Sequence, residues 1–387
     1  MGPLFLLLFS SSLFPISSSL DPECSMNALE LIQHWGYPAE QHSVTTQDKY
    51  QLTLLRIPHG MLAHLAHAWL FHGLEGCCTN WITNLPSQSA GFVFADAGFD
   101  VWLGNFRGNS YSRGHADAHI SEHDYWQFSW DEMALQDLPA MIDYALSVSG
   151  AEKLNYVGHS EGTMTLFALA SERPDWVLPR VENFFALGPV ATVQHIGGLM
   201  SYIAKLQWPL EQALKILGPN EFVPEPSFLR KFSEATCHNA AADRLVCENL
   251  YFLMFGPNTE NLNASRLPVY LAHSPAGTST KNVFHFAQGV KAELFQAYDY
   301  GVVGNLRHYG SIWPRRYDLR DINIPVYLFW GSKDVLADEQ DIFDTILPLV
   351  STIKGNFELD MNHCDLIWGL TAAKDVYQPI ANIIHNG

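Results

Sequence analysis

Residues 154–163 read LNYVGHSEGT and place a single serine, Ser160, between two glycines at the end of an apolar run. The apolar residues before Gly158 are typical of a buried strand, and the residues after Gly162 are typical of a helix. A strand, a sharp turn and a helix around G-x-S-x-G form a nucleophile elbow, which holds the serine in a strained conformation with its Oγ exposed. The flanking glycines avoid side chains that would collide with neighbouring backbone. The alternative is an ordinary N-cap serine between incidental glycines.

The segments around this motif alternate between short apolar strands and amphipathic helices, which indicates a parallel sheet with crossover helices. The alternation stops between about residues 191 and 309 and resumes at Pro325. We therefore predict an α/β fold with a mostly parallel sheet and an inserted, mainly helical cap. A helix from Asn27 to Trp35 and a hairpin precede the sheet. The predicted strands read HSVTT (42–46), QLTLLRI (51–57), HAWLFHG (67–73), DVWLGN (100–105), KLNYVG (153–158), VENFFALGP (181–189), PVYLFW (325–330) and GNFELD (355–360), and the longest predicted helix spans 129–150.

The composition favours a packed globular protein and argues against nucleic acid as a partner. Hydrophobic residues make up 48% of the chain and charged residues 16%, so extensive disorder is not expected. The formal net charge is −18, and the basic residues form no long cluster that could follow a phosphate backbone.

The N-terminus predicts entry into the secretory pathway. An apolar run from Leu4 to about Ile16 is followed by three small serines, so residues 1–19 are predicted to be a secretory signal peptide. No Lys or Arg precedes the run, which leaves an uncleaved anchor as the less favoured alternative. No later segment reaches the length of a transmembrane helix. We expect a soluble mature chain that is secreted or lysosomal.

The cysteines and one sequon fit an exported chain. Six cysteines allow fifteen full pairings, and the sequence does not choose among them. A local loop between Cys237 and Cys247 is the simplest first pairing, whereas buried free thiols are slightly favoured for Cys77, Cys78 and Cys364, and Cys24 is left open. Asn263 begins the sequon Asn-Ala-Ser and is a predicted glycosylation site.

A serine nucleophile needs a base and an orienting acid, which in this arrangement follow in the order serine, acid, histidine. After the strand at 326–330 the available bases are His363 and His385, and His385 is disfavoured because it lies near the end of the chain, on a tail expected to fray. Asp334 directly follows the strand and is the preferred acid, with Asp338 as the fallback. Asp338, Asp341 and Asp344 come later in this run, and all three are expected to be solvated surface groups on or entering a helix.

The tetrahedral intermediate needs two backbone N–H donors. Position predicts Glu161, directly after the nucleophile, and Leu74, in the loop after the strand at 67–73. An ordinary strand-ending glycine turn is the alternative for Leu74. The side chain of Glu161 would oppose the oxyanion if it were ionised and pointed inward. At a helix N-terminus it is also favoured by the dipole and can face solvent, and we expect it to tune the pH range.

The chain strongly resembles the acid lipase family, which includes gastric and lysosomal acid lipases. The resemblance covers nearly all of the mature chain, in family order, and rests on these stretches: HWGYPAE, HGL, AGFDVWLGNFRGNSYSR, FSWDEMALQDLPAMIDY, YVGHSEGT, LGPVA, AHSPAGTS, WGSKDVLAD and NHCDLIW. Glu161 departs from the glutamine that is common in the family, and GMLAHLAHAWLFHG lacks the usual β-branched strand.

The resemblance implies Ser160 as nucleophile, Asp334 as acid, His363 as base, and Leu74 with Glu161 as the oxyanion hole. It implies an α/β-hydrolase core, a lid in the cap, a disulfide between Cys237 and Cys247, and action on triacylglycerols or cholesteryl esters at a lipid–water interface without metal or organic cofactor. The resulting organisation is a signal peptide at 1–19, a first core part at 20–190 with a lipase-associated segment at 24–62, a cap and lid at 191–309, and a second core part at 310–387.

The sequence leaves other functions open. A carboxylesterase acting on soluble esters is the runner-up, and a non-catalytic lipid-binding protein is the alternative from another class. An epoxide hydrolase or dehalogenase is disfavoured, because those chemistries need a carboxylate at the position of Ser160. His64 and His67 are assigned no metal role, since two such histidines without other ligands are usually surface residues. The amphipathic run 200–217 is expected to pack on the core and in part to cover the serine.

Overall fold

The computed structural model describes residues 21–60, 66–198, 201, 220–222, 256 and 260–386. Within this part of the chain the central sheet has nine strands, eight of them in the order β1-β2-β4-β3-β6-β7-β10-β11, with β5 paired to β2. A separate two-stranded sheet joins β8 to β9. The strands are β1 (Glu40–Thr45), β2 (Tyr50–Ile57), β3 (Ala66–Phe71), β4 (Phe99–Leu103), β5 (Gly114–His115), β6 (Leu154–His159), β7 (Val181–Leu187), β8 (Glu221–Phe222), β9 (Thr278–Ser279), β10 (Val326–Gly331) and β11 (Ile353–Leu359).

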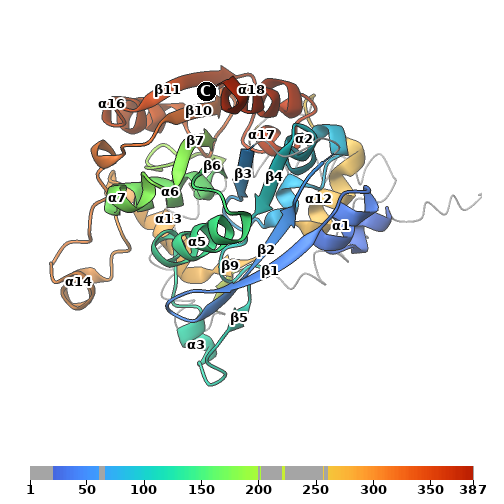
Figure 1. Ribbon diagram of the computed structural model, residues 1–387. Coiled ribbons are helices and arrows are strands. Elements are labelled where there is room, and N and C mark those ends of the chain that lie inside the picture. The colour runs from blue at the N-terminus through green and yellow to red at the C-terminus, as the bar shows by residue number, and fades with distance from the viewer. Residues whose placement is uncertain are drawn as a thin grey trace, which may run out of the picture.

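Helices cover both faces of the sheet, with α5 and α6 on one side and α2, α17 and α18 on the other (Figure 1). The helices are α1 (Ala28–His34), α2 (Ala90–Asp96), α3 (Glu122–Tyr125), α4 (Trp130–Glu132), α5 (Leu138–Ser149), α6 (Glu161–Glu172), α7 (Pro174–Val177), α12 (Leu267–His273), α13 (Thr280–Ala292), α14 (Gly301–Tyr309), α15 (Glu339–Asp341), α16 (Leu347–Leu349), α17 (Asp365–Trp368) and α18 (Gln378–Asn386).

Strand alternation divides the core into two clusters, one on each face. In β3, Trp69 and Phe71 join the cluster that includes α5 and α6. Leu70, between them, joins the cluster that includes α2 and α18. Strands buried on both faces are expected when helices cover both sides of a parallel sheet. Because β3, β6, β7 and β10 run parallel, their carboxyl ends lie at one edge of the sheet.

The predicted helix and hairpin that precede the sheet are confirmed. Helix α1 begins at a capping box in which Asn27 and Glu30 exchange hydrogen bonds with each other's backbone N–H. Strands β1 and β2 form the expected antiparallel hairpin, and β2 pairs antiparallel with β4. The rest of the sheet from β4 onward is parallel. Despite its lack of β-branched residues, the segment at 66–71 forms the predicted strand β3.

The single helix predicted over 129–150 is two α-helices, α4 and α5, joined by a π-helical turn at Met133–Asp137. Pro139 lies in the first turn of α5 and lacks the N–H that would bond the preceding turn. The helix ends where expected, at Gly150, which has a φ of 72°.

The sheet is split in sequence as predicted, since β10 pairs with β7 although the proposed cap separates them. Apart from Ser201, the run 200–217 lies outside the described residues, as do Cys237, Cys247, His64 and the signal region. The domain boundaries and the disulfide therefore remain predictions. In the described ranges, no helix combines the length and apolar character that crossing a membrane requires.

The prediction of a frayed tail around His385 is wrong. Helix α18 continues to Asn386, and the His385 ring stacks on Phe99 at a centroid distance of 4.9 Å. Phe99 is the first residue of β4, so His385 lies at the amino edge of the parallel strands.

Candidate active site

Ser160 lies in the sharp turn between β6 and α6 with the strained backbone expected of a nucleophile elbow. Its φ is 54° and its ψ is −118°, a conformation that a residue with a Cβ rarely adopts. The residue occupies the N-cap position of α6, but its side chain makes no capping hydrogen bond. The backbone N–H of Ser160 donates to the carbonyl of Leu187 at 3.0 Å. This geometry does not match the ordinary N-cap serine that was the alternative.

The two flanking glycines are required by close backbone packing. A Cβ at Gly158 would lie 2.7 Å from the carbonyl oxygen of Gly162. A Cβ at Gly162 would lie 2.6 Å from the carbonyl oxygen of Phe71. Both distances are shorter than real Cβ contacts, so any larger residue would displace the strand or the helix that aims Ser160.

His363 and Asp334 form a buried pair at the same edge of the sheet. His363 Nδ1 lies 2.7 Å from Asp334 Oδ2. The other carboxylate oxygen, Oδ1, accepts the backbone N–H groups of Leu336 at 2.8 Å and Ala337 at 2.9 Å. Both oxygens of Asp334 are therefore fixed, which sets the tautomer of His363 with its proton on Nδ1 and leaves Nε2 as a base.

Two contacts bring this pair to the elbow. His159, the residue before Ser160, donates from Nε2 to the carbonyl of His363 at 2.9 Å. Gly188 follows Leu187, which holds the Ser160 backbone, and a Cβ at Gly188 would lie 3.2 Å from His363 Cε1 and 3.4 Å from Asp334 Oδ2. The ends of β6, β7, β10 and β11 thus converge on Ser160.

The loop after β3 packs directly on the nucleophile. A Cβ at Gly73 would lie 2.9 Å from Ser160 Cβ, so glycine allows the close approach. His72 Nδ1 donates to the carbonyl of Gly73 at 2.9 Å, and its Nε2 accepts the Phe106 N–H at 3.2 Å. These bonds hold the loop that carries Leu74 against the elbow.

The Glu161 side chain does not face solvent, so the alternative that the sequence allowed is wrong. The residue is 1% exposed, and its Oε1 accepts a hydrogen bond from Asn282 Nδ2 at 2.6 Å. Burial raises the pKa of Glu161 to about 7. The first turn of α6 is covered by α13, a contact between residues far apart in sequence that local patterns do not predict.

Sequence reasoning missed Glu75, which directly follows Leu74. Its Oε1 is buried although part of the residue is exposed, and its φ is 56°. Burial, and then the negative charge of Glu161, raise the pKa of Glu75 to about 8. The sequence signal for Glu75 was an acidic residue within HGLEG (72–76), directly after a predicted oxyanion donor.

The acidic run after Asp334 is only partly a surface feature. Asp338 caps α15 through the N–H of Gln340, and Asp344 is exposed. Asp341 was predicted to be a solvated surface group, and this is wrong. It is buried, where it accepts the backbone N–H groups of Gln194 at 3.2 Å and His195 at 2.9 Å. Asp341 thus binds the start of the proposed cap rather than His363.

The structure also describes the cysteines, one histidine and the sequon asparagine that the sequence singled out. Cys77 and Cys78 are buried free thiols as predicted, and Cys24 and Cys364 are also buried. His67 pairs with Asp100 at 3.1 Å, an acidic neighbour that the sequence did not reveal. Asn263 accepts a bond from Ser265 Oγ at 2.7 Å, and its glycosylation remains a prediction.

Family models and known relatives match most of this chain. The alpha/beta hydrolase fold model matches residues 58–345, and the partial alpha/beta-hydrolase lipase region matches residues 28–85. Lipase lipl-1 of Caenorhabditis elegans is 43% identical, over 95% of this chain and 93% of its own length. Human lysosomal acid lipase/cholesteryl ester hydrolase is 41% identical, over 95% and 92%. Bovine gastric triacylglycerol lipase is 42% identical, over 94% and 92%.

Solved structures of low identity share the fold. A candidate lipase from Sulfolobus solfataricus aligns with a TM-score of 0.61 at 11% identity, covering 90% of this chain and 94% of that one. The carboxylesterase CesB of Bacillus subtilis aligns with a TM-score of 0.50 at 13% identity, covering 92% and 95%. The predicted α/β-hydrolase fold is confirmed. The chain belongs to the α/β-hydrolase lipases and is a carboxylic ester hydrolase.

Proposed function

We propose that the chain hydrolyses neutral lipid esters, such as triacylglycerols or cholesteryl esters, through an acyl-enzyme formed on Ser160. The observation that carries this proposal is the buried His363–Asp334 pair, which is held beside the elbow by His159. The names of the relatives support the substrate class, since they include a triacylglycerol lipase and a cholesteryl ester hydrolase.

Each residue of the site has a proposed role. Ser160 Oγ attacks the ester carbonyl while His363 accepts its proton at Nε2, because Nδ1 is bonded to Asp334. His363 then returns the proton to the leaving alcohol, and Asp334 stabilises the imidazolium formed between these steps. Water repeats the sequence on the acyl-enzyme and releases the fatty acid.

The backbone N–H groups of Leu74 and Glu161 are proposed to bind the oxyanion. Support comes from the packing of Gly73 against Ser160, which places the Leu74 loop beside the nucleophile. Glu161 is the first residue of α6, so its N–H is not used within the helix and lies at the positive end of the dipole. Backbone donors fixed in this way stabilise the intermediate without reorganising.

We further propose that residues 191–309 form a cap whose lid opens at a lipid surface, and that the chain acts in the secretory pathway, either secreted or in lysosomes. The lysosomal and gastric relatives support this assignment. Tributyrin hydrolysis measured across its solubility limit distinguishes lipase from soluble-ester esterase. A rise in rate above the limit is expected, and saturation below it would favour the esterase.

Covalent trapping tests the nucleophile. The purified protein is treated with diethyl p-nitrophenyl phosphate and the modified peptide is located by mass spectrometry. We expect one diethyl phosphate on Ser160, loss of activity in proportion to labelling, and no label in Ser160→Ala. Equal labelling of Ser160→Ala would contradict the proposal.

A further inference from the structure

Each of the two proposed oxyanion donors has a glutamate side chain beside it in the sequence. Glu75 follows the Leu74 donor directly, and Glu161 provides the other donor with its own backbone N–H. The two segments follow β3 and β6, which are neighbouring strands that pair in parallel. The inference drawn from these glutamates rests on the proposed oxyanion hole.

The environment of both carboxyl groups disfavours ionisation. Glu161 is buried and its Oε1 has Asn282 as hydrogen-bond partner. Glu75 Oε1 is buried without a hydrogen-bond partner in the described part of the chain. The negative charge of Glu161 would further disfavour ionisation of Glu75. A buried acidic pair of this kind keeps its protons at acidic pH.

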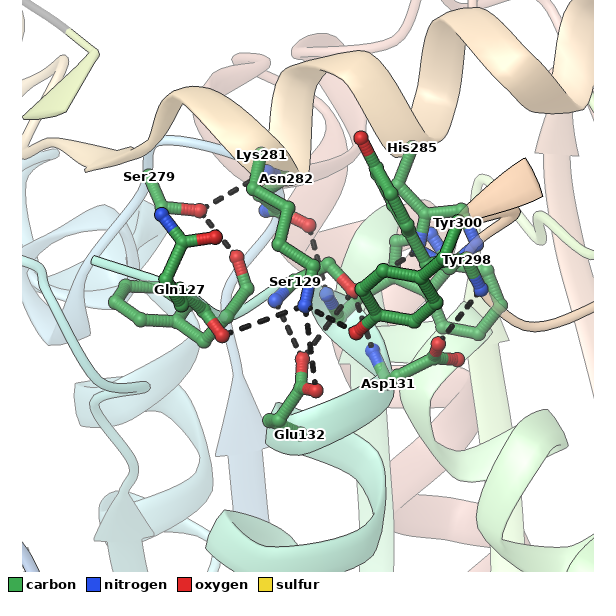
Figure 2. Close-up of polar contacts among 12 residues, drawn as sticks. Gln127, Ser129, Asp131, Glu132, Ser279, Lys281, Asn282, His285, Tyr298 and Tyr300 are labelled. Atoms are coloured by element: carbon green, nitrogen blue, oxygen red, sulfur yellow. Dashed lines mark hydrogen bonds and ion pairs between the residues drawn. The ribbon is translucent and has the colours of Figure 1, made fainter. Parts of the chain in front are cut away.

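The cations on neighbouring segments are held by other groups. Arg113 bonds the side chain of Glu221, which is in β8. Lys281, next to Asn282 in α13, donates to the carbonyl of Gln127 at 3.3 Å and to Tyr300 Oη at 2.7 Å, as Figure 2 shows. Neither cation contributes to the raised pKa values of the two glutamates.

The histidines that pack around the pair stay neutral. Burial lowers the pKa of His72, in the Leu74 loop, to about 4. Burial, and the charge of His363, also lower the pKa of His159, on β6. His72 and His159 therefore add no positive charge beside the two glutamates at pH 5 to 8.

Asn282 fixes the orientation of the Glu161 carboxyl. Its Oδ1 accepts the backbone N–H of Trp130 at 2.7 Å, so its NH₂ group must face the other way. That NH₂ group donates to Glu161 Oε1 and to Thr278 Oγ1. Oε1 of Glu161 is therefore the acceptor for Asn282, and a proton on the Glu161 carboxyl group resides on Oε2. Figure 2 shows Asn282 beside Ser279 at the start of α13.

We propose that Glu75 and Glu161 form a carboxyl pair whose protonation controls the oxyanion hole. While the pair carries its protons, the hole is flanked by neutral groups and can receive an oxyanion. When the pair ionises, its negative charge opposes the oxyanion and repels the Leu74 loop from the start of α6. Glu75 and Glu161 are positioning residues in this account, and they restrict turnover to acidic pH.

The test follows kcat and KM for p-nitrophenyl butyrate, a soluble ester that needs no lipid surface, from pH 4 to 9. The variants are Glu75→Gln, Glu161→Gln, the double variant, and Glu172→Gln as the matched control at the exposed end of α6. Glutamine retains the acceptor for Asn282, so the fold is expected to persist. Thermal unfolding of each variant checks this.

We expect the wild-type kcat to fall as pH rises from 6 to 8, with little change in KM. In the double variant, the pH at which kcat falls should be higher by about one unit. At pH 8, kcat relative to its acidic plateau should then be about tenfold higher than in wild type. Each single variant should move it part of the way, and Glu172→Gln should match wild type. If either single variant is unstable, the other still tests the coupling.

An alkaline limb unchanged in all three variants would overturn the inference. The outcome is separable from failure of the proposed function, because Ser160→Ala is measured in parallel. Activity retained in Ser160→Ala would contradict the nucleophile, whatever the pH profiles show. An inactive Ser160→Ala with an unchanged limb in the Gln variants would refute the carboxyl pair alone.

Discussion

Asp334 Oδ2 lies 2.7 Å from His363 Nδ1, while Oδ1 of the same carboxylate accepts two backbone N–H groups. The carboxylate cannot rotate without breaking three hydrogen bonds. Such a clamp holds the imidazole in one tautomer and one orientation, and it stabilises the imidazolium that forms during proton transfer. This relationship supports the proposal that Asp334 is the acid of the triad.

Asp334→Asn should lower kcat by about 10⁴-fold, because the amide can present an NH₂ group to the Nδ1 proton and disfavours the required tautomer. Steady-state kinetics on p-nitrophenyl butyrate measure the effect. Asp338→Asn is the matched control, since asparagine keeps the α15 cap. Comparable losses in both variants would contradict the assignment of Asp334.

Gly162→Ala should destabilise the fold by about 2 kcal/mol or more, because its Cβ would lie 2.6 Å from the Phe71 carbonyl oxygen. Gly150→Ala is the control. It has a φ of 72° and no neighbour within 4 Å, so it should cost only about 1 kcal/mol of left-handed strain. Urea unfolding of both variants measures the difference. Equal midpoints would show that the elbow is not closely packed.

Arg107→Met should lower the free energy of unfolding by about 3–5 kcal/mol, because it leaves the buried Asp137 carboxylate without its partner. Arg107 Nη2 lies 2.7 Å from Asp137, and Nη1 lies 2.6 Å from Asp48. Lys153→Gln breaks an exposed pair with Glu182 and should cost below about 1 kcal/mol. Chemical denaturation at pH 7 tests both, and a loss for Arg107→Met as small as that for Lys153→Gln would contradict the prediction.

The stability of wild type should fall relative to Glu75→Gln between pH 5 and 8. The pKa of Glu75 is raised from 4.5 to about 8 in the fold, so the native state binds more protons than the unfolded chain in this window. The contribution is fully present below pH 4.5 and is lost as pH rises through about 8. Urea midpoints at pH 5 and 8 measure it. A constant difference between the two proteins at both pH values would show that Glu75 is not buried as an acid.

Local patterns predicted the parts of the site that depend on chain order. The strand before Ser160, the helix after it and the glycines on both sides are encoded within ten residues, and Asp334 follows its strand directly. Such features need no knowledge of distant contacts, because strand and helix periodicity place them at the carboxyl edge of a parallel sheet.

Features that depend on packing between distant segments were not predictable. The burial of Glu161 results from α13, more than a hundred residues later in the chain. The burial of Asp341 results from the segment at Thr192–His195. His385 is ordered by Phe99, again a tertiary contact. An acidic residue in a polar run has the sequence signature of a surface group whether or not another element covers it.

The most direct test of the central claim is fatty-acid release from emulsified trioleoylglycerol between pH 4 and 8, comparing the purified mature protein with Ser160→Ala. The account predicts release by the wild-type protein, with higher rates at acidic pH, and a loss of about 10⁴-fold or more in the variant. Equal release by both proteins would contradict it. So would the absence of release from both on long-chain and short soluble esters alike.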